Sequence, residues 1–406
     1  MPVRVPSQRP PLVPTLTAGV SYEPRSDHDA RAGRWAALDV ARGVAVAGML
    51  VVEQLPAGPG GYPWLRHALW NGWTGADLVF PAFLFLVGIS VDQLVGRRGR
   101  AGLWRLVKRA VALIVVGVLF NAWAADGADF AQARWPGVLQ RIGVVSLACG
   151  VIVFVVRRKA WPVLAVAGAL LVGYAQLLTR APLACGAGVL TPACNLPGRI
   201  DLAVFGSAHI YHQGVFGHDP EGLLSTLGAL ATALLGVAVG RLMRERPGWR
   251  VITALAAGAA LAWLVTHLGL AGPPVNKRLW TPAFVLLTAA TSVTLLLVCH
   301  AVADVGGAAR QRVVRLAATT VSWPWVALGR NALVVYVGQH VLGAIAAKTP
   351  AHDGPTATSL AGYLQGRTFA GGWLVLDAQW TYVAAMLLLW SAVAAAMHCA
   401  RWYVTL

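Results

Sequence analysis

Residues 75–95 read GADLVFPAFLFLVGISVDQLV. This apolar run is long enough to cross a bilayer as a helix, which needs roughly 17–25 residues. Comparable runs recur along the chain, and most are rich in Ala, Val, Leu and Gly, as membrane helices that pack on small residues are. We count ten candidate spans, at residues 36–54, 75–95, 108–124, 137–156, 160–178, 223–243, 250–270, 280–303, 322–346 and 378–400. The sequence therefore predicts an all-α, polytopic integral membrane protein with about ten transmembrane helices.

The composition of the whole chain supports this class. Of 406 residues, 57% are hydrophobic and only 12% are charged, whereas a soluble domain carries about 25% charged residues. So few charges cannot solvate the surface of a compact body of this size in water. A soluble globular enzyme, a disordered chain and a coiled coil are therefore excluded.

The distribution of charge predicts the topology. The net charge is +17, with 33 Lys and Arg against 16 Asp and Glu. Such a balance can indicate nucleic-acid binding, but in membrane proteins Lys and Arg collect in cytoplasmic loops. With a cytoplasmic N-terminus, 23 of the 33 basic residues fall on that side and 8 on the other, while Arg141 and Arg330 lie inside spans. We expect both termini in the cytoplasm and no nucleic-acid partner.

Two parts of the chain are expected. Residues 1–34 hold no apolar run of seven or more, which predicts a disordered cytoplasmic tail and no secretory signal peptide. Residues 35–406 form the transmembrane domain. The outer segment 179–222 contains Cys185 and Cys194, with eight residues between them, and the oxidising side of a membrane suits a disulfide there. No Cys/His spacing of a metal site is present, so no metal is expected.

The densest polar stretch is 53–81, EQLPAGPGGYPWLRHALWNGWTGADLVFP, which joins the first two spans on the outer side. His67 is its only side chain with a near-neutral unperturbed pKa, which suits a general base or a nucleophile. Asp77 begins the next span, where a carboxylate would orient the histidine and stabilise its charged form. The alternative is an interfacial loop in which His67 only packs among tryptophans.

The order of residues in this stretch favours the catalytic interpretation. Residues 67–81, HALWNGWTGADLVFP, closely resemble the signature of the heparan-α-glucosaminide N-acetyltransferase family, H-A-x-W-(N/H)-G-(W/L)-T-x-x-D-L-V-F-P-x-F. Five further segments are similar to motifs of that family, in the same order: LDVARG (38–43), PGVLQRIG (136–143), DPEGLL (219–224), NKRLWT (276–281) and GRNA (329–332). The resemblance covers roughly residues 35–400.

The resemblance implies an acetyl group that is carried by cytoplasmic acetyl-CoA and delivered to a sugar amine on the other side. It implies that His67 is the catalytic residue. The family usually has Asn at the end of the first span, where this chain has Glu53 and Gln54. The Gln54 amide would polarise the acyl carbonyl or place the acceptor, and an ionised Glu53 would help to deprotonate an acceptor amine or hydroxyl. His340 follows Tyr-Val-Gly-Gln, one residue out of the family's register, and receives no role.

Other motif residues have expected roles in binding. Asn71, Asp219 and Glu221 would bind the acceptor on the outer face, although carboxylates at 219 and 221 would equally cap the helix that follows. Donors inside the membrane are suited to the pyrophosphate and carbonyl groups of a CoA tunnel, and the residues expected there are Arg141, Arg330 and Asn331. The basic run from Arg97 to Arg109 is interpreted as topogenic charge that faces anionic lipid.

These observations predict a transmembrane acetyltransferase of the bacterial inner (plasma) membrane, with His67 as catalytic base or acyl carrier. The expected partners are acetyl-CoA as co-substrate, a glycan or amino-sugar acceptor, the lipid bilayer and, in a homodimer, a second copy of the chain. The alternative is a multi-pass transporter or permease without acyl transfer, because ten Gly-rich spans with a few buried charges also describe such proteins.

Overall fold

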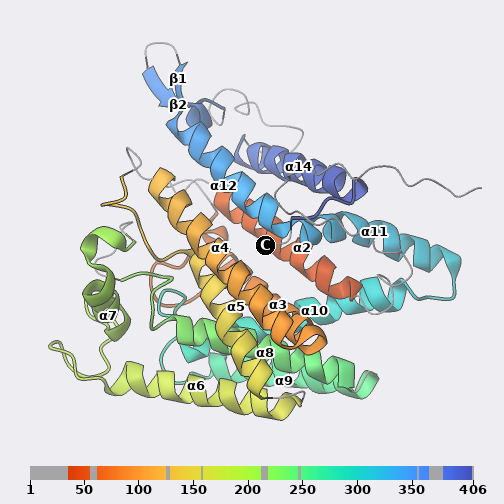
Figure 1. Ribbon diagram of the computed structural model, residues 1–406, viewed down its shortest axis with the longest axis horizontal. Helices are drawn as coiled ribbons and strands as arrows, with labels where there is room; N and C mark the ends of the chain where they lie inside the picture. The colour runs from red at the N-terminus through yellow and green to blue at the C-terminus, as the bar shows by residue number, and fades with distance from the viewer. Residues whose placement is uncertain are drawn as a thin grey trace, which may run out of the picture. The chain divides into compact units, whose positions relative to one another are not determined.

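The structure is a computed structural model, and it describes residues 35–54, 62–124, 129–156, 159–211, 218–245, 248–353, 356–364 and 378–404. The predicted tail at 1–34 lies outside the described residues. The described elements are helical except for one short hairpin (Figure 1). In chain order they are α2 (Ala36–Gln54), η1 (Pro63–Leu65), α3 (Gly75–Arg98), α4 (Arg100–Ala124), α5 (Val138–Val155), α6 (Ala160–Arg180), α7 (Leu196–Phe205), η3 (Ser207–His209), α8 (Thr226–Glu245), α9 (Trp249–His267), α10 (Pro282–Cys299), the π-helical η4 (His300–Gly306), α11 (Arg312–Arg330), α12 (Ala332–Lys348), β1 (Pro350–Asp353), β2 (Thr356–Ser359), α13 (Leu360–Tyr363) and α14 (Ala378–Cys399).

The predicted class, an all-α polytopic membrane protein, is confirmed. Seven helices in the described part of the chain are long and apolar enough to cross a membrane. They cover 75–98, 138–155, 160–180, 226–245, 249–267, 282–306 and 380–399. The helix at the first predicted span, α2, carries Asp39, Arg42 and Glu53 along its 19 residues and is not among these seven.

One predicted span is wrong in its continuity. Residues 322–346 were expected as one helix, but the chain breaks at Asn331, with φ −109° and ψ 20°, between α11 and α12. The Asn331 side chain bonds the carbonyl of Ala327 at 3.0 Å, in the last turn of α11. Gly329 also lies so close to α2 that a Cβ atom would stand 1.9 Å from the carbonyl oxygen of Asp39. A polar cap and a close backbone approach therefore end α11 inside an apolar sequence.

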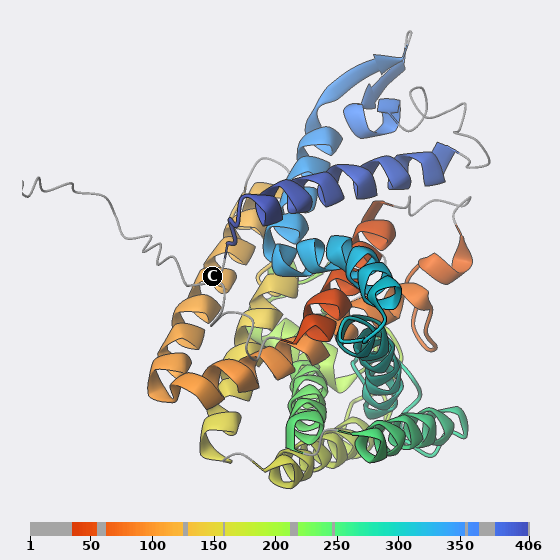
Figure 2. The same ribbon diagram turned by 90° about the vertical axis from the view of Figure 1, so that its right-hand side faces the viewer.

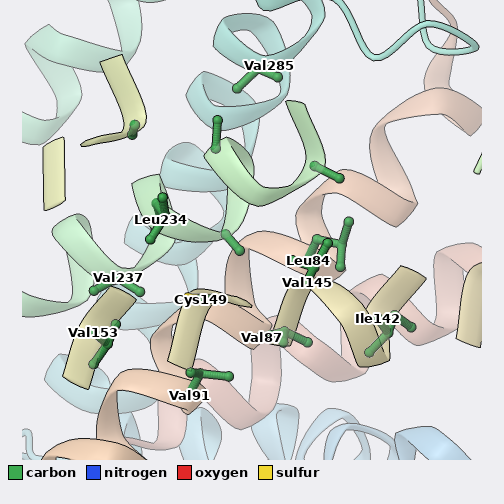
Figure 3. Close-up of a cluster of buried hydrophobic side chains, with 14 of the residues drawn as sticks. Leu84, Val87, Val91, Ile142, Val145, Cys149, Val153, Leu234, Val237 and Val285 are labelled. Atoms are coloured by element: carbon green, nitrogen blue, oxygen red, sulfur yellow. The ribbon is translucent and has the colours of Figure 1, made fainter. Parts of the chain in front are cut away.

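The centre of the bundle is the pair α3 and α8. A Cβ on Gly88 would lie 1.9 Å from the carbonyl oxygen of Ala233, and one on Gly236 would lie 2.0 Å from that of Phe85. The two backbones therefore touch, which is how small residues drive the packing of membrane helices. Figure 3 shows the apolar cluster around this contact, to which α3, α5, α8 and α10 contribute Leu84, Val87, Val91, Ile142, Val145, Cys149, Val153, Leu234, Val237 and Val285.

Other helices lie at the edge of the bundle. α6 packs on α8 and α9 packs on α10 (Figures 1 and 2). Only 22% of the apolar window of α6 and 11% of that of α9 is buried, so the apolar side chains on these helices face outward. An apolar outer surface of this kind is stable only against lipid.

At the end of α12, β1 and β2 form an antiparallel hairpin in which Pro350 pairs with Ser359.

Candidate active site

The loop that carries His67 is attached to the segment before α10. Gly72 adopts φ +97°, a conformation that favours glycine, and its amide donates to the carbonyl of Val275 at 2.8 Å. A parallel bridge pairs Gly72 with Asn276, and the Asn276 amide donates to Asn71 Oδ1 at 3.2 Å. The two motifs HALWNG and NKRLW, distant in sequence, thereby form one surface.

Asp77 is buried at the start of α3 and organises the loop before it. With Thr74 it forms a capping box, a reciprocal arrangement that satisfies the free amides of a helix start. Its Oδ2 accepts hydrogen bonds from the amides of Thr74 at 3.0 Å and Ala68 at 3.1 Å. Its Oδ1 lies 2.8 Å from Nδ1 of His67. The predicted pairing of His67 with Asp77 is thus present in the structure.

The pairing defines which nitrogen of His67 is available. An ionised carboxylate only accepts hydrogen bonds, so we assign to Nδ1 the hydrogen that faces Asp77, and Nε2 is left as the acceptor nitrogen, with Lys277 Nζ 3.1 Å from it. The His67 side chain is 43% exposed, whereas that of Asp77 is fully buried. A substrate can therefore reach the ring while the protein holds its tautomer and orientation.

Lys277 completes this cluster, and the sequence analysis did not assign it a role. Its Nζ lies 2.8 Å from Nδ1 and 3.1 Å from Nε2 of His67, and 3.4 Å from Oδ1 of Asp77. The side chain is only 14% exposed. Burial lowers the pKa of Lys277 by more than the charges of Asp77, Glu221 and Glu53 raise it. Its ammonium is therefore more acidic than that of a lysine in water.

A tight turn holds Lys277 in this place. Trp280 has a positive φ of 52°, which is uncommon outside glycine. Its amide donates to the carbonyl of Lys277 at 3.0 Å, and its indole Nε1 donates to Thr232 Oγ1 at 3.1 Å. The ring is completely buried, so the packing of Trp280 between helices fixes the backbone that presents Lys277. The sequence signal for this role was the NKRLWT motif itself.

A second charged cluster is built around Arg134. Its guanidinium donates to both carboxylate oxygens of Asp219, at 2.8 Å and 2.5 Å, and also bonds Glu221. Burial acts to raise the pKa of Glu221, but the charges of Arg134 and Arg141 hold it below its ordinary value. The predicted binding carboxylates, Asp219 and Glu221, are therefore both paired with Arg134.

Asp201, from α7, lies directly beneath this cluster. Its carboxylate accepts the amides of Leu223 at 2.9 Å and Asp219 at 3.3 Å. The contact requires glycine at position 222, where a Cβ would lie 1.9 Å from Oδ2 of Asp201. Burial raises the pKa of Asp201 to about 6. Asp201 was not predicted from the sequence because no motif contains it.

Arg141 is almost fully buried at the start of α5. Its Nη2 donates to the carbonyl of Gly222 at 3.1 Å and to Ser225 Oγ at 2.5 Å, and its guanidinium lies 4.9 Å from the centre of the Trp280 ring. Within the described residues, its Nε and Nη1 have no hydrogen-bond partner. These two buried donors have the capacity to bind an anionic or carbonyl group.

The other two residues expected at the donor site belong to a different set of contacts. Arg330 stacks on Tyr403, with 3.8 Å from the guanidinium to the ring centre. Asn331 donates to the carbonyls of Ala327 and Ala394 and so connects α11 to α14. Arg141 contacts the chain before α8, so the three predicted donor-site residues form two groups.

Glu53 and Gln54 end α2 beside the middle of α12. Gln54 Nε2 donates to Oε1 of Gln339 at 3.4 Å. The Glu53 carboxylate lies 3.8 Å from Nε2 of His340, a residue to which the sequence analysis gave no role. Because the charge of Glu53 also affects Lys277, Glu53 is within electrostatic range of the His67 cluster.

A disulfide closes the loop beside the site. Cys185 and Cys194 are bonded, a pairing that the sequence analysis found compatible with the oxidising side of the membrane but did not decide. Trp70, three residues after His67, donates from Nε1 to the carbonyl of Leu190 at 2.7 Å, inside this closed loop. The disulfide loop is therefore hydrogen-bonded to the HALWNG motif through Trp70.

Comparison with known proteins agrees with the motifs. A family model described as heparan-alpha-glucosaminide N-acetyltransferase, catalytic, matches residues 34–271. The match includes His67, Asp77 and the Arg134 cluster and ends shortly before Lys277.

Two similar proteins carry the name heparan-alpha-glucosaminide N-acetyltransferase. The protein from Mus musculus is 26% identical over 393 residues, which cover 83% of this chain and 57% of the relative. The protein from Homo sapiens is 28% identical over 369 residues, which cover 76% of this chain and 53% of the relative. The chain thus spans about half the length of the curated relatives it matches.

Proposed function

We propose that this chain, which belongs to the heparan-alpha-glucosaminide N-acetyltransferase catalytic family, is a transmembrane acetyltransferase. It transfers an acetyl group from cytoplasmic acetyl-CoA to an amine or hydroxyl of a glucosamine-type sugar on the periplasmic side of a bacterial inner membrane. The observation that carries the proposal is the accessible His67 ring in contact with the buried carboxylate of Asp77 and with the amine of Lys277.

In this mechanism Asp77 holds the imidazole with its hydrogen on Nδ1, which leaves Nε2 as base or nucleophile. In the direct route, the acceptor amine attacks the thioester carbonyl carbon as the C–S bond breaks. His67 Nε2 takes the amine proton and gives it to the departing thiolate.

In the two-step route, Nε2 itself bonds the carbonyl carbon and the CoA thiolate leaves. The resulting acetylimidazolium is stabilised by Asp77. The acceptor amine then takes the acetyl group, His67 is regenerated, and the amine proton neutralises the thiolate. In either route the Lys277 ammonium, which lies 3.1 Å from Nε2 in the structure, turns from the ring and donates to the oxyanion that develops on the carbonyl.

The remaining site residues have roles that follow from their contacts. Arg141, with two buried donors available, binds a carbonyl or phosphate oxygen of the acetyl donor, and Arg330 with Asn331 lines the cytoplasmic part of the donor path. Asn71 and the Asp219–Glu221 pair bind acceptor hydroxyls or the amine. Glu53 helps His67 to deprotonate the acceptor, and Gln54 positions the acceptor.

The test uses the purified full-length chain in detergent with acetyl-CoA and glucosamine. The expected result is release of CoA thiol that depends on the acceptor, and its loss, at least about 1,000-fold, in His67→Ala. His267→Ala is the matched control, because His267 stacks on Trp263 at the end of α9. Thiol release that survives in His67→Ala would contradict the mechanism.

Two further measurements separate the alternatives. Protein incubated with acetyl-CoA and no acceptor is analysed by mass spectrometry, and an acetylated His67 identifies the two-step route. Uptake of amino sugar into liposomes without any thiol release would support the alternative function, a permease, and contradict the acetyltransferase.

A further inference from the structure

A cavity of about 980 Å³ lies at the opposite end of α3 from His67. It is formed where α3, α5 and α8 end and where the chain enters α6. Its lining includes the charged residues and the aromatic residue Asp92, Arg97, Phe154, Lys159, Arg241 and Arg244. Three of the four helices that line the cavity, α3, α5 and α8, contribute to the packed apolar core, so their positions relative to one another are fixed.

The floor of the cavity is an organised cationic site. Arg241 is 4% exposed and donates to Asp92 Oδ1 from Nε at 2.9 Å, while its Nη1 donates to the carbonyl of Lys159 at 2.8 Å. Arg244, one turn further along α8, also bonds Asp92. One carboxylate thus orients two guanidiniums, and the planar fork of Arg is suited to phosphate oxygens.

The charge of the lining is not balanced. Arg97, Lys159, Arg241 and Arg244 supply four positive charges, whereas Asp92 and Glu245 supply two negative ones. The excess of two positive charges in a partly buried site favours an anion with one or two negative charges.

One wall of the cavity is apolar and faces outward. Phe154 lines the cavity and is 41% exposed, and on the same helix Val151 and Val155 are 44% and 70% exposed. Trp161, two residues after Lys159, is 67% exposed, as tryptophans at membrane interfaces are. In a membrane-spanning protein these side chains contact acyl chains. The cationic floor therefore continues directly into a lipid-facing surface.

From this combination we infer that the cavity binds the headgroup of an anionic phospholipid. The phosphate lies against Arg244 and Lys159, above the Asp92–Arg241 pair, and the acyl chains follow Phe154 and Val155. A water-soluble nucleotide would use the cationic floor but would leave the exposed apolar wall without a partner. Basic pockets between transmembrane helices are a recurring form of lipid recognition. The inference does not depend on the acetyltransferase activity.

The experiment measures lipid retention by the full-length chain in detergent, by native mass spectrometry. Phosphatidylglycerol and phosphatidylcholine are titrated separately. We expect retention of phosphatidylglycerol in preference to phosphatidylcholine, and a reduction of about 30-fold in the variant K159Q/R244Q, since each basic residue near a phosphate contributes roughly fivefold. Arg244 is 37% exposed and the Asp92–Arg241 pair is unchanged, so the variant should fold, which its melting temperature verifies.

The matched control is R105Q/K108Q, which removes the same charge from exposed positions on α4, near the same end of the bundle. An equal loss in both double variants would show general surface attraction and overturn the site. Two water-soluble phosphate compounds, adenosine 3′,5′-diphosphate and inorganic phosphate, are added as competitors of the lipid. Displacement of phosphatidylglycerol by micromolar nucleotide diphosphate, with no preference between the two lipids, would assign the cavity to a soluble phosphate ligand and overturn the proposal.

Discussion

Helix α3 carries a buried aspartate near each end, and the two have different partners. Asp77 lies in its first turn and Asp92 in its last two turns, about 22 Å apart along the helix at 1.5 Å per residue. Asp77 contacts a histidine, a lysine and backbone amides. Asp92 contacts two arginines.

The difference lies in which partners can exchange protons. Histidine is a side chain that both donates and accepts protons, and burial lowers the pKa of Lys277, so the Asp77 cluster contains groups that can exchange protons. Arginine remains charged at any physiological pH, so the Asp92 cluster can attract an anion but cannot perform acid–base chemistry. Two aspartates in one helix therefore have partners suited to different roles, proton exchange at one end and anion binding at the other.

The largest effect is expected for Asp77→Asn. The amide can present its NH₂ group to His67, which would favour the tautomer with hydrogen on Nε2 and remove the reactive lone pair. We expect acetyl transfer to fall by about 1,000-fold or more, measured as CoA thiol release. A fall of less than tenfold in a normally folded variant would show that Asp77 acts only as the cap of α3.

Asp92→Asn is the comparison at the other end. It leaves Arg241 buried without its carboxylate, which costs about 3 kcal/mol of stability. We expect a lower melting temperature in detergent, with acetyl transfer per folded molecule unchanged within about twofold. If Asp92→Asn lost acetyl transfer without losing stability, this result would contradict the assignment of different roles to Asp77 and Asp92.

Lys277 gives a smaller effect with a distinct pH dependence. Because burial lowers the pKa of Lys277, its ammonium deprotonates at lower pH than an ordinary lysine, and activity should decline on the alkaline side as that charge is lost. Lys277→Met should reduce transfer by about 10- to 100-fold. Lys277→Arg, which stays charged, should retain more activity and shift the alkaline decline to higher pH. An unchanged pH profile in the Arg variant would indicate a structural role.

The smallest effect on acetyl transfer is expected for a change at Asp201, which acts on stability. Its pKa is raised to about 6 by burial, so the folded protein binds this proton more tightly than the unfolded chain does. The contribution to stability is fully present below about pH 4 and is lost as the pH rises through about 6. We expect Asp201→Asn to remove this pH dependence of stability between pH 4 and 7, which a shift of about two pKa units sets at no more than about 3 kcal/mol, measured as the melting temperature at each pH. Parallel curves for the two proteins would contradict this assignment.

Much of the fold was predictable because apolar length and flanking charge set where membrane helices begin and end. The span at 36–54 coincides with α2, and the span at 378–400 differs from α14 by one residue. The break at Asn331 was not predictable, because it depends on the contact of Gly329 with α2. An apolar sequence does not reveal where another helix approaches.

The site was predictable where its residues are close in sequence. His67 and Asp77 are ten residues apart, within one motif. Lys277 is 210 residues from His67, and only the folded chain shows that the two motifs pair. Arg134, which holds Asp219 and Glu221, has no motif of its own and was likewise found only from the structure.

The Cys185–Cys194 bond has a consequence for how the protein is produced and handled. Trp70 is hydrogen-bonded into the loop that this bond closes, so the covalent state of the loop supports the segment that carries His67. Thiols stay oxidised in the periplasm and become reduced in the cytosol. A reducing agent in a purification buffer would therefore open the loop to which Trp70 is hydrogen-bonded. Production in an oxidising compartment keeps this loop closed beside the segment that carries His67.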